Sequence, residues 1–400
     1  MFPKLRFKKF DGDWTAVTLE SLAEVERGKF SVRPRNDPRY FGGEMPFIQT
    51  GDVTGSDVYL KGYTQTLNDD GIRVSKVFPA DTILITIAAN IGDTTITQYP
   101  VACPDSVVAI QPKQDKVNTI FLKNVIDLQK DNLDSQATQN AQKNINLQVL
   151  KPLKLIVPSK EEQNKIASFL SAVDEKISQL TQKLELLSQY KQGMMQKLFS
   201  QQIRFRADDG SEFGEWETTT LGQTGKFIGG GTPSKENSEF WEGSIPWISS
   251  SDLTEESIFK INITRFISQN ALNQSATKLV PANSILIVSR VGVGKVAITP
   301  NEICTSQDFT SLTLHKGSSI FFAYLIKSLT PYLLEMNQGT SIKGFIKDDL
   351  ANLELKIPCI EEQTKIANFL SAIDQKIEVV AQQIEQAKQW KKGLLQQMFV

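Results

Sequence analysis

Few residues of this chain have types and spacings that could support catalysis. His315 is the only histidine, so a Ser-His-Asp triad would depend on it, and no G-x-S-x-G motif accompanies it. We therefore interpret it as an ordinary surface or core histidine. The segment at 292–295, Gly-Val-Gly-Lys, resembles part of a phosphate-binding loop, but Val296 stands where G-x-x-x-x-G-K-[ST] requires Ser or Thr. Because glycine permits tight turns, the segment is better interpreted as a turn between strands.

Two acidic positions could suggest the carboxylates of a nuclease. Asp174 and Asp374 are each followed two residues later by a lysine. Both fall in stretches with helical periodicity, so we expect them on a solvated helix face. The sequence thus predicts a chain without a catalytic centre.

Composition limits the classes of protein further. Cys103, Cys304 and Cys359 lie far apart and have no metal-ligand spacing, which indicates a reducing cytosol and no metal site. We find no signal peptide and no uncharged apolar run of 18 residues, so we expect a cytoplasmic protein without membrane contact. The net charge of −1 argues mildly against nucleic-acid binding, although the local field matters more than the total.

An internal repeat is the strongest feature of the sequence. The segment from Glu161 to Asp174 returns from Glu361 to Asp374 at an offset of 200 residues, and the offset holds to Phe199 and Phe399. The chain has 400 residues, so it contains one unit, a domain followed by a long helix, twice.

Each copy of the repeat predicts a helix with one apolar stripe. Apolar residues recur at alternating steps of four and three, the spacing of a left-handed coiled coil, and one position is missing in each copy, at Lys191 and Lys391. A helix of about 40 residues is roughly 60 Å long and cannot bury its own stripe, so we expect the two helices to pair. The predicted interface comprises Ile166, Leu170, Val173, Ile177, Leu180, Leu184, Leu187, Ile366, Leu370, Ile373, Ile377, Val380 and Ile384.

The start of the first helix has a predicted capping box. Ser159 precedes Glu162 by three residues, the spacing at which each side chain can bond the other's backbone N–H. Cys359 occupies the position of this serine in the second copy, so its cap is expected to be weaker by about 1 kcal/mol.

Two similar mixed α/β domains, with an α+β organisation, are expected to alternate with these helices. We expect a buried strand at 81–87, helices at 121–130 and 146–150 and a last strand at 153–157. The predicted segments are a first domain (1–158), a central helix (159–200), a second domain (201–357) and a C-terminal helix (358–400). Framework positions such as Trp14 and Trp216 match, whereas loops such as 33–40 and 231–242 differ freely.

The chain resembles the specificity (S) subunit of type I restriction–modification systems over nearly all of its length. The resemblance rests on the repeated Pro-x-x-Glu-Glu-Gln-x-Lys-Ile-Ala-x-Phe-Leu-Ser-Ala-x-Asp helix, on the order domain, helix, domain, helix, and on the stretch from Gly230-Gly231-Thr232-Pro233 to Ile245-Pro246-Trp247-Ile248. The first domain lacks the Gly-Gly-Thr-Pro stretch, so its reading loop is expected to differ.

The resemblance implies a non-catalytic subunit with two target recognition domains, each reading one half of a bipartite sequence in double-stranded DNA. The paired helices, which we expect to be antiparallel, would set the spacing and dock two methyltransferase (M) subunits; restriction (R) subunits would join them. No cofactor is expected in this chain; S-adenosylmethionine and ATP would belong to partner subunits. Two readers on one face of DNA should lie about 34–36 Å apart or a multiple of this distance.

Candidate base-reading residues are polar or basic side chains in the loops that differ between the domains. Such side chains can bond base edges in the major groove. The candidates are Arg33, Arg35, Arg39, Gln49, Thr232, Ser234, Lys235, Arg265 and Arg290.

Two other interpretations remain open. The chain could be a coiled-coil scaffold that never reads DNA, which sequence-selective binding by the assembled complex would exclude. It could also be a fused methyltransferase, but it lacks an Asn/Asp-Pro-Pro-Tyr/Phe tetrapeptide and a Gly-rich loop after a first strand.

Overall fold

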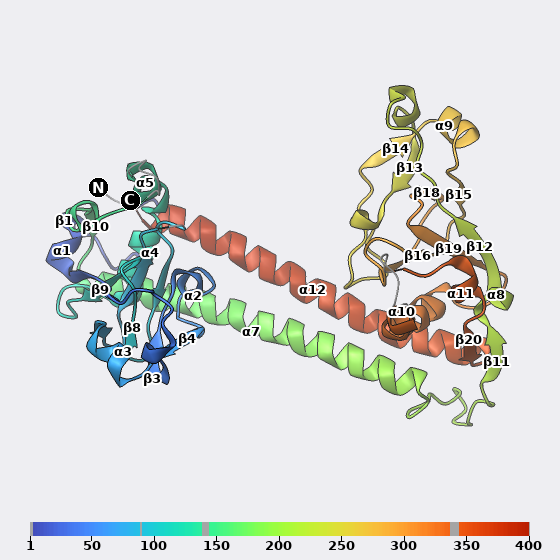
Figure 1. The fold of residues 1–400 in the computed structure, drawn as a ribbon, viewed down its shortest axis with the longest axis horizontal. Coiled ribbons are helices and arrows are strands. Elements are labelled where there is room, and N and C mark those ends of the chain that lie inside the picture. Colours follow the sequence, from blue (N-terminus) through green and yellow to red (C-terminus); the bar gives the residue numbers. More distant parts are fainter. Residues whose placement is uncertain (1–2, 89, 138–143, 337–343, 400) are drawn as a thin grey trace. The chain divides into compact units, whose positions relative to one another are not determined.

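The computed structural model describes residues 3–88, 90–137, 144–336 and 344–399 and divides the chain into two compact units. Unit 1 comprises Met1–Thr181 with Gln382–Val400, and unit 2 comprises Gln182–Ala381. Each unit contains one mixed domain and a part of each long helix, α7 (Lys160–Phe199) and α12 (Ile360–Met398) (Figure 1).

The two domains have the same order of strands, whereas some of the helices between the strands differ in type and number. The elements of unit 1 are β1 (Thr15–Thr18), α1 (Leu19–Leu22), β2 (Ala23–Arg27), η1 (Pro38–Tyr40), β3 (Phe41–Phe47), α2 (Thr50–Thr54), β4 (Gln65–Leu67), α3 (Asp69–Arg73), β5 (Val77–Phe78), β6 (Ile83–Thr86), β7 (Thr94–Ile96), β8 (Val101–Ala102), β9 (Val107–Pro112), α4 (Thr119–Asp127), α5 (Lys130–Gln136), α6 (Leu147–Leu150) and β10 (Lys154–Val157). Those of unit 2 are β11 (Glu217–Thr220), α8 (Leu221–Thr224), β12 (Gly225–Gly229), η2 (Ser238–Trp241), β13 (Ile245–Ile248), η3 (Ser250–Asp252), β14 (Arg265–Ile267), α9 (Gln269–Gln274), β15 (Leu279–Val280), β16 (Ile285–Val288), β17 (Val296–Ile298), β18 (Ile303–Thr305), β19 (Phe309–Leu314), α10 (Ser319–Met336), α11 (Lys347–Ala351) and β20 (Glu354–Ile357). The helices and strands predicted near 81–87, 121–130, 146–150 and 153–157 are confirmed, although the first helix ends at 127 and α5 follows it.

Among the residues that the structure describes, each domain contains two four-stranded sheets and a two-stranded ladder. In unit 1 the sheets have the orders β2-β9-β6-β7 and β4-β3-β8-β5, and β1 pairs with β10. Unit 2 repeats these orders as β12-β19-β16-β17 and β14-β13-β18-β15, with β11 paired to β20. The pairs β3–β8 and β13–β18 are parallel, and every other pair is antiparallel. The predicted class, two similar mixed domains joined to long helices, is confirmed.

The inner strands β6 and β16 of the first sheet in each unit are buried on both faces. In β6, Ile83 and Ile85 pack against the helices, whereas Leu84 packs against the second sheet. In β16, Ile285 likewise packs against the helices and Leu286 against the second sheet. Side chains alternate across a strand, so a strand covered on both faces is apolar at nearly every position. This explains the uninterrupted apolar run seen in the sequence.

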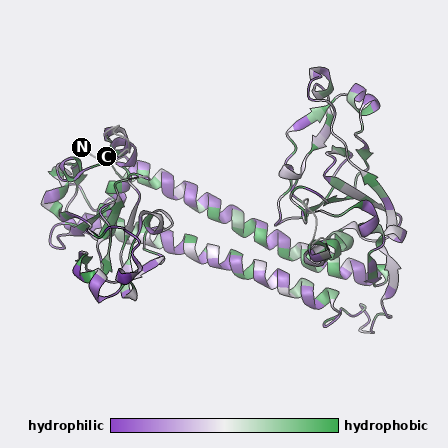
Figure 2. Cartoon of the chain, viewed as in Figure 1, coloured by the Kyte–Doolittle hydropathy of each residue, from purple (hydrophilic) through white to green (hydrophobic). Residues whose placement is uncertain are grey.

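The long helices share a hydrophobic core near their ends within each unit. The residues of the predicted stripe are all buried or half-buried, and Figure 2 shows hydrophobic and hydrophilic residues interspersed along both helices. In unit 1, Leu170 at the start of α7 shares a core with Leu394 near the end of α12. In unit 2, Leu198 near the end of α7 shares a core with Leu370 near the start of α12. Each unit thus combines the first part of one helix with the last part of the other, as expected of antiparallel helices.

The repeated Glu-Glu-Gln motif anchors each helix to its domain. The carboxylate of Glu162 is buried and accepts hydrogen bonds from Nε and Nη2 of Arg6, both at 2.7 Å. In unit 2, Arg204 donates to Glu362 at 3.1 and 2.7 Å, and Trp216 Nε1 donates to the same carboxylate at 3.1 Å. These carboxylates raise the pKa of both arginines. Charge-assisted pairs of this kind are among the stronger hydrogen bonds in proteins.

The glutamine of the motif closes the same joint. Gln163 accepts from the backbone of Asn118 at 3.0 Å and donates to the carbonyl of Pro158 at 3.0 Å, thereby linking α4 to α7. Gln363 accepts from Ser318 at 3.1 Å and donates to Pro358 at 2.9 Å. The motif is therefore repeated because the joint between domain and helix is repeated.

This joint corrects the predicted capping box and adds residues that the sequence analysis missed. Ser159 Oγ accepts from the Glu162 backbone at 3.4 Å, but the Glu162 carboxylate binds Arg6. A signal for this arginine was present, because Leu-Arg-Phe at 5–7 recurs as Ile-Arg-Phe at 203–205.

Salt bridges occupy the two missing positions of the apolar stripe. Lys191 Nζ lies 2.5 Å from Asp374 Oδ1, with both side chains less than 10% exposed. Lys391 Nζ lies 2.6 Å from Asp174 Oδ1, with both about one-fifth exposed. The expectation that these aspartates lie on a solvated face is wrong, because each is covered where the facing helix presents its lysine.

The pair in unit 2 belongs to a larger buried cluster. Tyr324 of α10 donates its hydroxyl proton to the Asp374 carboxylate, and burial together with this carboxylate raises the pKa of Tyr324. The corresponding residue of unit 1, Asn124, donates to the backbone of its own helix at 2.8 Å. The aspartate of unit 2 is therefore held by two side chains from other helices.

Replacing Lys191 with Met should destabilise unit 2 by about 3–5 kcal/mol, because it leaves the Asp374 carboxylate buried without its cation. The matched change Lys391→Met should cost less, since Asp174 is more exposed. Urea unfolding of the purified chain followed by circular dichroism measures both. Lys191→Met combined with Asp374→Leu should recover only part of the loss, because the buried Tyr324 hydroxyl then lacks its acceptor. Equal losses in the two single variants would contradict this assignment.

Lys327 provides a second test in the same cluster. Burial and the neighbouring Lys191 lower its pKa to about 8. Its ammonium donates to the carbonyl of Glu255, and the acids Asp374, Glu255 and Glu256 oppose the shift. Between pH 8 and the ordinary lysine value of 10.5 the unfolded chain binds more protons than the folded chain, so this group makes stability rise with pH over that window.

Lys327→Met should remove this rise. The difference in unfolding free energy between the parent chain and the variant, measured at steps from pH 7 to pH 10.5, isolates the contribution of Lys327 from that of other groups. The variant should gain most at pH 7 and lose its advantage as the pH increases. A difference that does not change with pH would show that Lys327 titrates normally.

Candidate nucleic-acid interface

The candidate site of each unit is built on the turn that follows an inner strand of the second sheet, β3 in unit 1 and β13 in unit 2. In unit 1 the chain leaves β3 through Gln49 into α2, and the backbone N–H of Gln49 donates to Asp52 Oδ2 at 2.8 Å. In unit 2 it leaves β13 through Ser249 into η3, and the N–H of Ser249 donates to Asp252 Oδ2 at 2.7 Å. The aspartate at the third position thus locks the same turn in both units.

A returning strand places one more polar side chain against each turn. In unit 1, Gln65 of β4 lies opposite Phe47 and accepts a hydrogen bond from Gln49 Nε2 at 3.0 Å. In unit 2, Arg265 of β14 lies opposite Trp247, and its Nη2 donates to Ser249 Oγ at 2.8 Å and to the Asp252 carboxylate. Gln65 was missed by the sequence analysis, although it stands 200 residues before Arg265.

Two tryptophans join this turn to the Gly-Gly-Thr-Pro loop of unit 2. The guanidinium of Arg265 lies 4.7 Å from the ring centroid of Trp247, which meets Trp241 edge to face at 5.0 Å. Trp247 Nε1 donates to the carbonyl of Gly231 at 3.0 Å, and Trp241 Nε1 donates to that of Ser234 at 3.1 Å. The candidates Ser234 and Arg265 are therefore linked through the two tryptophan rings, without a direct hydrogen bond between them among the described residues.

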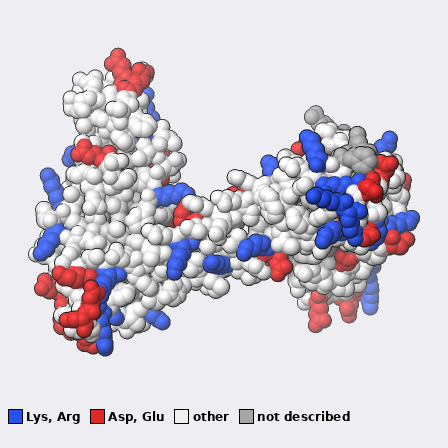
Figure 3. Space-filling view, turned by 180° about the vertical axis from the view of Figure 1, so that it is seen from behind, with Lys and Arg blue, Asp and Glu red and all other residues white. Residues whose placement is uncertain are grey.

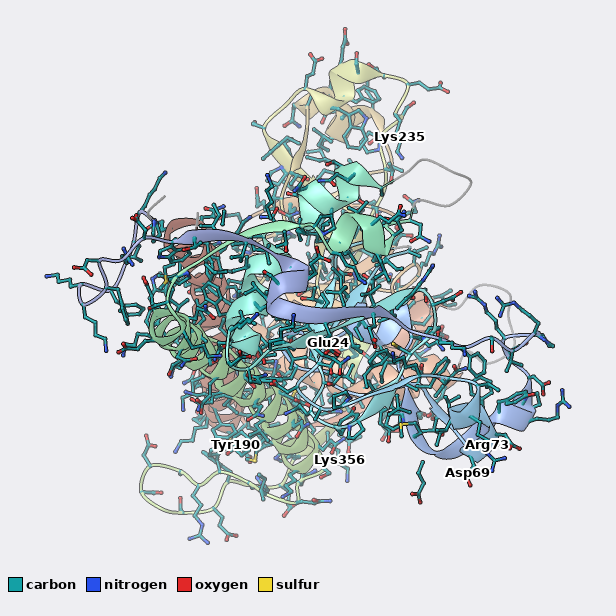
Figure 4. All side chains as sticks on the ribbon, turned by 90° about the vertical axis from the view of Figure 1, so that its left-hand side faces the viewer. Glu24, Asp69, Arg73, Tyr190, Lys235 and Lys356 are labelled. Carbon is teal, nitrogen blue, oxygen red and sulfur yellow. The ribbon has the colours of Figure 1, made fainter. Side chains whose placement is uncertain are left out.

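The remaining candidates of unit 2 lie on nearby loops. Thr232 bonds Gln307 through its hydroxyl, and the exposed Lys235 follows Ser234 on the outer part of the unit (Figure 4). Arg290 is also exposed, in the turn between β16 and β17.

The glycine-rich segment is a strand turn, as predicted. Gly292 and Gly294 have φ values of +82° and +101°, which favour glycine. The turn places Lys295, another residue that the sequence analysis missed, against the Ser249–Asp252 turn, where its Nζ donates to the carbonyl of Ser250 at 3.1 Å. No phosphate-binding loop is formed, because the segment runs directly into β17.

The arginine candidates of unit 1 occupy a separate loop. Arg33 donates to the carbonyl of Val32, and Arg35 is paired with Asp105 at 3.0 Å. Arg39 forms a bidentate pair with Asp37 and holds the pKa of that carboxyl below its ordinary value. Among the residues that the structure describes, no hydrogen bond joins these arginines to Gln49.

Positive charge is concentrated locally even though the whole chain is nearly neutral. Figure 3 shows Lys and Arg side chains gathered on the face of unit 1 that is turned to the viewer, with a few acidic side chains beside them. The net charge of −1 is an average over the chain, whereas an anionic partner responds to the field of the nearest surface.

The other residues singled out in the sequence offer no catalytic geometry within the described part of the chain. Burial raises the pKa of Cys103 to about 12 and that of Cys304 to about 11, which disfavours the reactive thiolates. His315 follows β19, and its backbone N–H donates to the carbonyl of Thr224. The described residues contain no cluster of three or more His, Cys, Asp or Glu suited to a metal ion. None of the described helices is long and apolar enough to cross a membrane.

Comparisons with known proteins agree on one family. A family model described as "Type I restriction modification DNA specificity domain" matches residues 11–189 and 214–389. The MjaX type I restriction enzyme specificity subunit of Methanocaldococcus jannaschii is 26% identical over 98% of this chain and 94% of its own length. The EcoR124I/EcoR124II specificity subunit of Escherichia coli is 36% identical over 40% of this chain and 41% of its own length.

The fold is also found among solved structures. The S subunit of a type I restriction–modification system from M. genitalium superposes with a TM-score of 0.62 at 18% identity, over 100% of this chain and 99% of that one. A chain from a structure of type I restriction–modification complex assembly superposes with a TM-score of 0.60 at 16% identity, over 97% of this chain and 98% of that one.

Proposed function

The chain belongs to the family of type I restriction–modification DNA specificity domains, and we propose that its two units read the two halves of a bipartite target in double-stranded DNA. It is a specificity subunit, and specificity subunits do not carry out catalysis themselves. The proposal concerns how this chain recognises DNA and which partners it assembles with.

The observation that carries the proposal is the duplicated turn with unequal side chains. Asp52 and Asp252 lock the same backbone turn, but the side chains held beside them are glutamines in unit 1 and an arginine with a serine in unit 2. A repeated framework with different polar groups suits two readers of different sequences, because base edges are distinguished by their patterns of donors and acceptors. A scaffold that only held other proteins would have no need of this difference.

The partners of this subunit would supply the chemistry. We assign the transfer of a methyl group from S-adenosylmethionine to adenine to methyltransferase subunits, one for each unit, and ATP-driven cleavage to restriction subunits. The assembly would act on chromosomal DNA in the cytoplasm. The paired helices would dock the methyltransferases and set the distance between half-sites.

A genome-wide map of methylated adenine tests the proposal directly. The map is made in cells with and without this gene, and the partner methyltransferase is present in both. A split motif with two defined halves and a constant gap should appear only with the gene. If no motif depends on the gene, selective DNA binding by the purified complex decides between an inactive partner and the scaffold interpretation.

Changing helix length tests the spacing function. One heptad inserted after Thr181 and another after Ala381 would lengthen both helices by about 10 Å while keeping the apolar stripe in register. The gap of the methylated motif should grow by about three base pairs, since each base pair adds about 3.4 Å. The half-sites themselves should not change.

The control is a chain with only one of the two insertions. It should lose assembly or methylation, because the stripes of the two helices no longer match. A gap that stays the same in the doubly lengthened chain would contradict the proposal that the helices set the spacing.

A further inference from the structure

Residues 65 and 265 occupy the same place in the two units but have different hydrogen-bonding chemistry. Each is the first residue of the strand that returns beside the locked turn, at an offset of 200 residues. Each lies opposite an aromatic residue of the preceding strand, Phe47 or Trp247. The backbone is thus repeated, whereas the group presented is a carboxamide in unit 1 and a guanidinium in unit 2.

The guanidinium of Arg265 is held in one orientation. Asp252 and Ser249 bind its Nη2, and Trp247 lies against its face at 4.7 Å. Within the described residues, Nε and Nη1 make no hydrogen bond, and 38% of the side chain remains exposed. An arginine held in this way presents free donors at little further entropic cost, because its geometry is already set.

Such donors match guanine better than any other base. Guanine offers two acceptors, O6 and N7, on its major-groove edge, and arginine binds both in a bidentate pair. For Arg265 this pair would use Nη2 together with Nε or Nη1, so Nη2 would exchange its bond to Ser249 for the base while Asp252 keeps the other. Other cations near this turn are available for contacts with the phosphates of the DNA backbone. Lys295 is fixed beside the same turn, and the exposed Lys235 and Arg290 lie on adjoining loops. Phosphate contacts can therefore position the unit while Arg265 is left to specify a base.

The amide of Gln65 matches adenine. Its oxygen accepts one hydrogen bond from Gln49, and in the described part of the chain its amide nitrogen makes no hydrogen bond. Glutamine pairs bidentately with N6 and N7 of adenine, donating to N7 and accepting from N6. The position equivalent to Lys295 is Asp93, which is paired with Lys130, so this position presents a carboxylate in place of a lysine.

We propose that Arg265 reads a guanine in the half-site bound by unit 2, and that Gln65, braced by Gln49, reads an adenine in the half-site bound by unit 1. The inference rests on the proposed function, because it assigns one base to each reader. The two equivalent positions would then recognise different bases because their side chains differ.

The test measures methylation base by base. The subunit and its methyltransferase are purified as a complex, supplied with S-adenosylmethionine and given a plasmid library randomised around the motif. Sequencing then reports the methylation rate for every base at every position. The variants are Arg265→Gln and Gln65→Ala, and the control is Arg206→Gln, which removes an exposed arginine paired with Glu212 and remote in sequence from the turn.

Arg265→Gln should reduce the preference for guanine at one position of one half-site by about 5- to 150-fold and shift it toward adenine. Gln65→Ala should relax one adenine position in the other half-site. The control should retain the parent motif. If the Arg265→Gln variant does not assemble, Arg265→Lys replaces it in the test. This variant keeps a cation beside Asp252 but lacks the paired N–H donors of the guanidinium. It should weaken the same guanine preference.

Three outcomes would overturn the inference. Slower methylation of an unchanged motif by Arg265→Gln would mean that Arg265 binds phosphate. Changes by both variants in the same half-site would mean that the units do not read separate halves. An altered position that is not guanine in the parent motif would refute the base assignment. If the parent complex itself shows no split motif, the proposed function fails first, and this result is distinct from the other three.

Discussion

The joint between each domain and its helix is the constraint on which the structure depends. A long helix can determine where a reading domain lies only if the two are joined without a flexible hinge. The joint is made by a buried glutamate and a buried glutamine in the first turn of the helix, at 162–163 and again at 362–363. The glutamate accepts hydrogen bonds from an arginine in each unit. The glutamine accepts from a backbone amide and donates to a backbone carbonyl. A buried carboxylate is tolerable only when it is paired, so the partners must be present wherever the motif occurs.

A second set of paired charges specifies how the helices meet. An apolar stripe alone allows several registers and both orientations, because leucine and isoleucine pack with many neighbours. Lysines at 191 and 391 interrupt the stripe and find aspartates on the facing helix in each unit. Any other register would leave these charges buried without partners. Buried polar residues within an apolar seam select register in this way at some cost in stability.

Beyond these shared joints the units are free to differ. The turns that follow β3 and β13 have the same locking aspartate, but the side chains on them differ in length, charge and hydrogen-bonding capacity. Trp241 and Trp247 add an edge-to-face pair in unit 2 that joins the turn to the loop at 230–234. The framework is thus shared by the two units, whereas the polar side chains presented beside the turns are not.

The sequence by itself determined the duplication, the length of the helices, their apolar stripe and the buried central strands, because repeats and periodicities are properties of a linear chain. It also supported the class of protein through the repeated motif. Only the tertiary structure decided which side chains meet. Lys191 finds Asp374 across 183 positions, Arg6 finds Glu162 across 156, and Gln65 meets a turn that no local pattern connects to it. Polarity alone assigned Asp374 to a solvated face, whereas the facing helix buries it. Contacts between distant segments depend on how the elements pack, and periodicity within one segment does not contain that information.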